Sequence, residues 1–348
     1  MDTPFFLFLI GGMPLGWLLG GRESTHACGA IQINRVLPYR HAAIACALFV
    51  LLGATLNGAG VGRTLAMSGQ LHASCAAMIA TGITVMLHSL AWIQGHRLPV
   101  VQTLVGALIG CLLHDALPSQ PIRFAPILAG WLVAPFVAAL LGRGLYQTGL
   151  SWLARRRIHL LTRDALTRQA LLLASLFTAY ALGANNLAAV TGPFLAVGST
   201  TWSTPFDTLG LGIQALPLLG GIAMAAGLIH ARADRDAPPA APIPLSPLGM
   251  AVATFSSGLT LLLFASESVA SLLAATGLPA ISLVPLSLEQ TMAGAVAGIT
   301  SIHGLRFIDW RFWLRTAAGM LLVPLFAACV TFVVMFLVTH VLNLCRPI

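Results

Sequence analysis

Apolar runs of roughly 20 residues recur along the chain, and most are separated by short polar stretches. A helix of that length crosses the hydrocarbon core of a bilayer, so each run predicts one membrane-spanning segment. Two longer polar stretches interrupt the pattern, an arginine-rich linker at 147–168 and a proline-rich, charged loop at 230–246. Ten hydrophobic segments are predicted, at 4–20, 41–60, 72–94, 98–113, 124–146, 169–199, 208–230, 248–276, 283–301 and 313–342.

Composition supports the same architecture. The chain has 348 residues, of which 57% are hydrophobic and only 8% are charged. A soluble domain of this size would expose far more charge, so the sequence predicts an all-α polytopic membrane protein. The net charge of +8 does not indicate nucleic-acid binding, because no soluble domain is left to carry it.

The distribution of arginine predicts the orientation. All 18 basic residues are arginine; fifteen fall in loops on one side of the predicted membrane, and only Arg63, Arg123 and Arg346 fall on the other. Positive residues concentrate in cytoplasmic loops. Both termini are therefore predicted outside the cytoplasm, and the linker 147–168 inside it, in a multi-pass protein of the cell (inner) membrane.

The chain also contains an internal repeat. QTLVGALIG at 102–110 returns as QTMAGAVAG at 290–298, and each copy precedes an apolar segment with an internal proline, Pro135 or Pro324. Each half has five segments, an odd number, so the second half would enter the membrane in the opposite direction. The prediction is two inverted-topology repeats, at 1–146 and 169–348, with broken or re-entrant helices near the midplane. Secondary transporters commonly have this architecture.

Two adjacent amides, Asn185 and Asn186, interrupt the apolar stretch LGANNLAAVTGP at 182–193. Amides inside a bilayer need polar partners. Two interpretations follow, a binding site for an ion or substrate, and hydrogen bonding between packed helices. Glycine before the pair and Gly-Pro at 192–193 predict a helix broken near the midplane, with backbone dipoles facing a bound ion.

This stretch resembles the duplicated signature GANDxANxxGP of the inorganic phosphate transporter (PiT) family, and GANNLAAVTGP keeps most of that signature in the second half. GLPAISLVPLSLEQTMAGAVAG at 277–298 is similar to a second motif of that family, and 29–69 resembles the stretch that follows its first signature. The resemblance implies a symporter of inorganic phosphate coupled to sodium or protons, with sulfate as the substrate in some branches. No cofactor is implied apart from the coupling ion.

The departures from the family pattern bear on its chemistry. The family aspartate falls on Asn186, a later family asparagine on Ala189, and the family histidine on Gln290. In the first half the signature is predicted near 11–21, where apolar residues would replace its polar core. One of two pseudo-symmetric ion sites would then have lost its side-chain ligands.

Two acids are predicted to lie within the membrane, Glu267 and Glu289. An ionisable residue in a transmembrane segment is a functional candidate by default. Because loss of the family aspartate leaves few oxygens for sodium, a proton is the predicted coupling ion, carried by Glu267 first and Glu289 second. Gln102 and Gln290 are predicted to meet across the repeat axis. The predicted substrate contacts are Asn185, Asn186, Gln102, Thr103, Gln290, Thr291 and Ser287.

Other classes of function lack their motifs. The sequence has no HExxH pattern, no Walker loop and no CxxC spacing, so neither an enzyme with catalytic residues, nor an ATP-driven pump, nor a metal site is predicted. Phosphate is the leading substrate, with a sulfate permease of the same fold as the alternative. A non-transporting membrane subunit and a homo-oligomer are left open.

Overall fold

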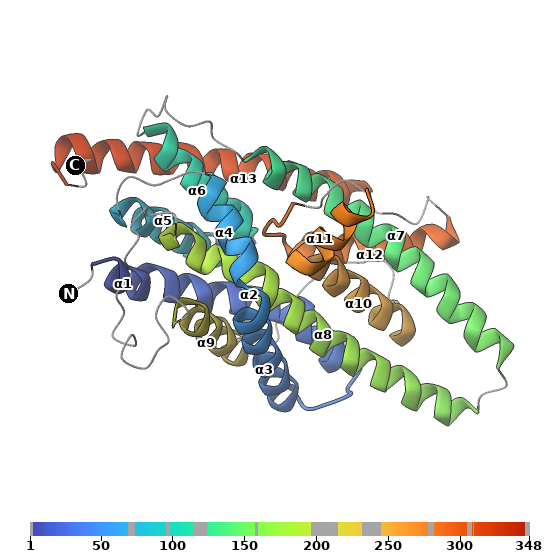
Figure 1. Ribbon diagram of the computed structural model, residues 1–348. Helices are drawn as coiled ribbons and strands as arrows, with labels where there is room; N and C mark the ends of the chain where they lie inside the picture. Colours follow the sequence, from blue (N-terminus) through green and yellow to red (C-terminus); the bar gives the residue numbers. More distant parts are fainter. Residues whose placement is uncertain are drawn as a thin grey trace.

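The computed structural model describes residues 3–68, 74–94, 98–114, 124–156, 159–195, 215–231, 245–277, 282–304, 308 and 310–344. Regular secondary structure in these residues is entirely helical (Figure 1), which confirms the predicted all-α class. Six helices, counting joined turns as one, are long and apolar enough to cross a membrane. A seventh span is formed if α10 and α11, which meet at a 73° bend, are taken together.

Each of the ten predicted segments corresponds to a helix, a continuous helical run or a bent pair. The first half contains α1 (Thr3–Leu7), the π-helical turn η1 (Phe8–Gly12), α2 (Met13–Ile33), α3 (Tyr39–Asn57), α4 (Ala59–Ser68), α5 (Ser74–Ile93), α6 (Val100–His114) and α7 (Ala125–Arg155). The second half contains α8 (Leu160–Leu195), α9 (Ala215–His230), α10 (Pro247–Leu263), α11 (Glu267–Ala275), α12 (Leu288–Thr300), the short 3₁₀ turn η4 (Ser301–His303), α13 (Trp310–Phe336) and the π-helical turn η6 (Leu337–Val341).

The segment predicted as a linker, 147–168, is mostly helical. α7 continues to Arg155 and α8 begins at Leu160, because leucine, alanine, arginine and glutamine all favour helix. The second predicted loop, 230–246, falls mostly outside the described residues.

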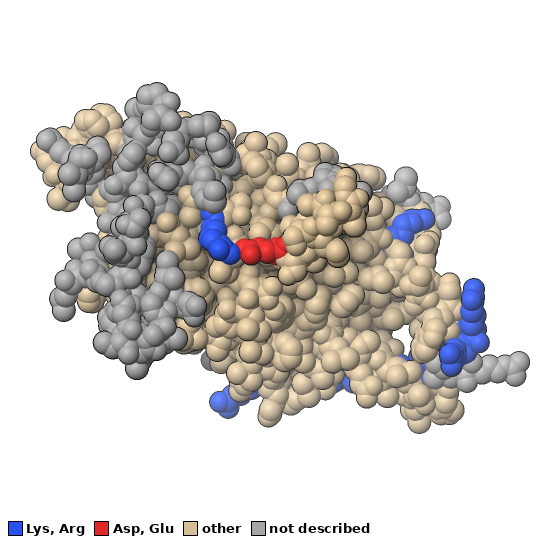
Figure 2. Space-filling model, in the orientation of Figure 1, with Lys and Arg blue, Asp and Glu red and all other residues tan. Residues whose placement is uncertain are grey.

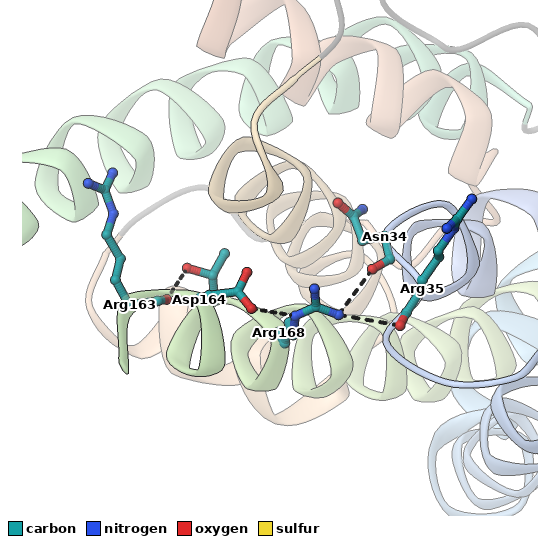
Figure 3. A network of polar contacts seen from close by, with 6 residues as sticks. Asn34, Arg35, Arg163, Asp164 and Arg168 are labelled. Carbon is teal, nitrogen blue, oxygen red and sulfur yellow. Dashed lines mark hydrogen bonds and ion pairs between the residues drawn. The ribbon is translucent and has the colours of Figure 1, made fainter. Parts of the chain in front are cut away.

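The start of α8 is tied to the end of α2. Figure 3 shows Arg168 donating from Nε to Asp164 at 2.7 Å, and from Nη1 to the carbonyl groups of Asn34 at 3.5 Å and Arg35 at 3.4 Å. Arg35 has the left-handed conformation, φ 52°, just beyond the last turn of α2. Arg168 therefore satisfies carbonyl groups near that helix end and links the two halves.

The predicted break in the sixth segment is wrong. α8 runs without interruption through the asparagine pair, and Pro193 lies in its last turn. Proline removes a backbone donor and crowds the carbonyl four residues before it, which here coincides with the end of the helix. The interruptions lie elsewhere: at Gly58 between α3 and α4, at 264–266 between α10 and α11, and in an extended stretch at 282–287 before α12.

The sequence repeat reappears in the packing. α6 packs against α13, and α12 packs against α7. A Cβ on Gly106 would clash with the carbonyl oxygen of Pro324, and one on Gly294 would clash with that of Pro135. Each small-residue helix thus approaches the backbone of the proline-containing helix from the other half. One turn further along, Gly110 lies against the carbonyl of Ala328, and Gly298 lies against that of Ala139.

A second set of glycine contacts relates α2 to α8 and α3 to α9. Gly20 lies against the carbonyl of Met224 just as Gly183 lies against that of Val50. Gly183 follows Gly20 by 163 residues, and the carbonyl partners of the next contacts, Trp17 and Tyr180, are separated by the same 163. In those contacts, Gly227 lies against the carbonyl of Trp17, and Gly53 lies against the carbonyl of Tyr180. The fold is consistent with the two predicted inverted repeats.

Candidate functional site

Asn185 holds together the elements around the bend between α10 and α11. Its Nδ2 donates to the carbonyl groups of Leu261 at 3.1 Å and Val284 at 3.0 Å, and its Oδ1 accepts from the backbone N–H of Leu286 at 2.7 Å. The end of α10 and the extended stretch before α12 are therefore both fixed to α8. All three of these bonds reach backbone, so Asn185 acts as a packing residue.

The extended stretch at 282–287 is buried from Val284 onward, and it is not helical. The N–H of Val284 donates to the carbonyl of Phe264 at 3.1 Å, and Nε1 of Trp131 donates to the carbonyl of Pro285 at 2.9 Å. Irregular backbone at membrane depth is tolerated only when protein groups satisfy it. With the bonds from Asn185, these contacts fix where α12 begins.

Asn186 differs from its neighbour. Its side chain is fully buried, and neither the amide nitrogen nor the amide oxygen has a hydrogen-bond partner among the described residues. A buried amide left without partners is costly, so it is the better candidate of the two for contact with a polar ligand. Hydrogen bonding between packed helices therefore describes Asn185, and a binding role is the interpretation that is left for Asn186.

The beginning of α12 gathers three further predicted residues. Ser287 precedes the helix and is buried, and its hydroxyl does not cap the helix. Gln290 and Thr291 are buried in the first turns, and Oγ1 of Thr291 donates to the carbonyl of Leu288 at 3.1 Å. A helix N-terminus with neutral donors is suited to an anion.

The corresponding pair in the first half lies on α6, which contacts α8. Gln102 is fully buried, and neither of its amide atoms has a hydrogen-bond partner among the described residues, Gln290 included. Thr103 is also buried and donates to the carbonyl of Pro99 at 2.8 Å. The approach of Gln102 to Gln290 stays a prediction.

The two predicted acids lie in different surroundings. Glu289 is half-buried in the first turn of α12. Glu267, predicted to be deep in the membrane, instead has an exposed side chain and forms an ion pair with Arg63 of α4. The bend after α10 places Glu267 at the start of α11, and its depth in the membrane stays a prediction.

A third acid, Glu23, was missed from the sequence. It is buried on α2, its Oε2 has no hydrogen-bond partner among the described residues, and it lies within electrostatic range of Glu289 and Arg22. α2 contacts both α8 and α12. In the described part of the chain, no three His, Cys, Asp or Glu side chains are grouped to hold a metal ion.

Known proteins with a similar sequence or fold bear on the role of this site. No family model matches the chain. A protein of Methanocaldococcus jannaschii, provisionally named a phosphate permease, is 22% identical over 329 residues, covering 94% of this chain and 96% of that protein. A solved structure described as a sodium-dependent phosphate transporter superposes with a TM-score of 0.73 at 18% identity, covering 96% of this chain and all of the other. Both similarities extend over nearly the whole chain.

The predicted resemblance to the phosphate transporter family is thereby confirmed, as is the multi-pass membrane architecture. The related proteins are named for transport and not for catalysis, in agreement with the prediction that the chain is not an enzyme.

The predicted place of the first-half signature needs a correction. It was predicted near 11–21, but the contacts of Gly20 match those of Gly183 and align GGRESTHACGA, 20–30, with GANNLAAVTGP, 183–193. Arg22 and Glu23 then occupy the positions of Asn185 and Asn186, so a polar core is present. The shared interval between glycines, Gly20 to Gly29 and Gly183 to Gly192, is a signal that could have revealed this register.

Proposed function

We propose that this chain is a secondary active transporter that carries inorganic phosphate through an ion-coupled symport mechanism. The observation that carries the proposal is Asn186, a fully buried amide without partners on a helix whose neighbour Asn185 fixes the surrounding backbone. The names of the related proteins support phosphate as the cargo. Gln102, Thr103, Ser287, Gln290 and Thr291 are the proposed further substrate contacts.

The substrate choice is between phosphate and sulfate. Phosphate near neutral pH retains a hydroxyl group, which can donate a hydrogen bond to a carboxylate. Fully ionised sulfate has no such group, and a carboxylate repels it. Asn186 is uncharged and does not repel sulfate, so sulfate stands as the alternative. Glu23, the residue aligned with Asn186 in the first half, supplies an acceptor on α2, a helix that contacts α8. This placement favours phosphate.

A proton is the proposed coupling ion, with sodium as the alternative. Glu23 and Glu289 lie within electrostatic range of each other, and a proton on either group removes their repulsion. Glu23 therefore joins Glu289 as a proposed carrier. The prediction from sequence that Glu267 carries the proton is a competing assignment, since that side chain is exposed and paired with Arg63.

Uptake of labelled phosphate into vesicles that contain only this chain tests the proposal. We expect accumulation driven by an inward proton gradient, inhibited more strongly by unlabelled phosphate than by sulfate. Accumulation of sulfate without phosphate would establish the sulfate permease alternative. Transport of neither anion would leave the non-transporting subunit as the remaining interpretation.

A further inference from the structure

An exposed ion pair joins the two halves of the chain. Nη2 of Arg63, on α4, lies 2.5 Å from Oε1 of Glu267, the first residue of α11. The two side chains are 65% and 56% exposed. Figure 2 shows an acidic and a basic side chain in contact near the centre of a largely uncharged face, where α4 and α11 lie in Figure 1. Because charge facing lipid is costly, such a pair indicates local access of water or of a charged ligand.

The backbone on both sides is built to allow this contact. α4 has 10 residues and follows the interruption at Gly58, while α11 has 9 residues and follows the 73° bend. Neither helix is long enough to cross a bilayer. A Cβ on Gly60 would lie 2.7 Å from Oε1 of Glu267. Only glycine at this position lets the carboxylate approach α4 so closely.

The pair lies next to the packing that covers the asparagine segment. Val61 and Ala265, each two residues before one of the charged residues, are buried together with Ala184 and Ala188 of α8. These two alanines flank the asparagines on α8. Arg63 and Glu267 are therefore carried by two elements that pack against α8 within the asparagine segment.

We propose that Arg63 is a capture site for the transported oxyanion. Glu267 pairs with the Arg63 guanidinium until the anion displaces the carboxylate. The proposal rests on the proposed function and adds a binding step before the asparagine segment. A guanidinium offers paired N–H donors that match two oxygens of a tetrahedral oxyanion, as they match a carboxylate. Exposed ion pairs contribute little to stability, so exchange of Glu267 for phosphate is feasible.

Two neutralising substitutions separate capture from a structural role, with labelled phosphate as the probe in vesicles containing the full chain. Loss of a charge-assisted contact in Arg63→Gln should raise the KM for phosphate about tenfold with Vmax nearly unchanged. Glu267→Gln frees the guanidinium and should lower KM severalfold. Raised ionic strength should weaken the effect of Arg63, since exposed charges are screened.

The matched control is a second exposed ion pair within the described residues, Asp164–Arg168, on α8. Asp164→Asn should leave KM unchanged. A purely structural pair would give KM shifts of the same sign in both test variants, and that result overturns the proposal. Loss of proton-driven uptake in Glu267→Gln also overturns it and assigns that residue to proton transfer. Misfolding cannot mimic a lowered KM, and absence of uptake by the unsubstituted chain would instead reject the proposed function.

Discussion

At the scale of single residues, Asn185 and Asn186 show that adjacent identical side chains serve different purposes. The sequence identified the pair, because amides in an apolar helix are costly. It did not reveal which amide packs and which is left open, since that depends on backbone carbonyl groups contributed by α10 and by the stretch before α12. The sequence also did not reveal the bend that places Glu267 at the start of α11, where it pairs with Arg63.

Substitution of each asparagine by alanine should separate the two roles. Asn185→Ala removes three hydrogen bonds to buried backbone and should lower the free energy of unfolding by roughly 3 kcal/mol. Asn186→Ala removes an amide without partners, so it should leave the melting temperature in detergent nearly unchanged while abolishing uptake. Equal loss of stability in both variants would contradict this division.

A carboxylate at the second asparagine should sharpen substrate choice. Asn186→Asp restores the residue of the family signature and supplies an acceptor for the phosphate hydroxyl. We expect the preference for phosphate over sulfate to rise by about tenfold, measured by competition in vesicles. An unchanged ratio would mean that residue 186 does not contact the anion, and Asn186→Gln serves as the neutral control.

At the scale of helices, the sequence repeat indicated which small-residue and proline-containing segments correspond in the two halves, because residues are still shared between its copies. QTLVGALIG and QTMAGAVAG keep their glycines in register, and those glycines make the same contacts in both halves. The relation between α2 and α8 was misjudged because few side chains other than glycine are shared. The break predicted in α8 is wrong because the helix continues past the asparagines and Gly192 and ends only two residues after Pro193.

Close approach at these glycines makes a prediction about packing. Gly294→Ala would place a methyl group against the carbonyl of Pro135 and should cost about 1–3 kcal/mol. Gly144→Ala is the control, because a Cβ there meets nothing within 4 Å on the same helix pair, and greater helix propensity should stabilise it by up to about 1 kcal/mol. Thermal unfolding in detergent measures both. A loss of stability in Gly144→Ala as large as in Gly294→Ala would argue against carbonyl contact as the cause.

At the scale of the whole molecule, hydrophobic patterning was sufficient for the class of fold. It predicted ten spans, whereas six or seven of the described helices are long and apolar enough to cross a membrane. Apolar length alone could not predict that the arginines of 147–168 continue two helices, because helix propensity extends beyond the apolar part of each. The sequence also did not predict the proposed pair of coupling acids. Glu23 and Glu289 are far apart in sequence and come together only through contact of α2 with α12.

The proposed coupling can be tested on the full chain in vesicles. Glu23→Gln should abolish phosphate accumulation driven by a proton gradient, yet retain exchange of labelled for unlabelled phosphate, since exchange needs no net proton movement. Glu289→Gln should reduce accumulation in the same way. Accumulation that requires sodium and survives Glu23→Gln would replace the proton with sodium as the coupling ion.

The glycine contacts also constrain how the chain can be repaired by mutation. Gly106, Gly183 and Gly294 each face a backbone carbonyl, which no codon change on the partner helix can shrink. Gly192, in contrast, faces the side chain of Leu65, so a smaller residue there can compensate for a larger one at 192. A screen for second-site suppressors should therefore recover changes at Leu65 for Gly192→Ala. For the three carbonyl-facing glycines it should recover mainly true revertants.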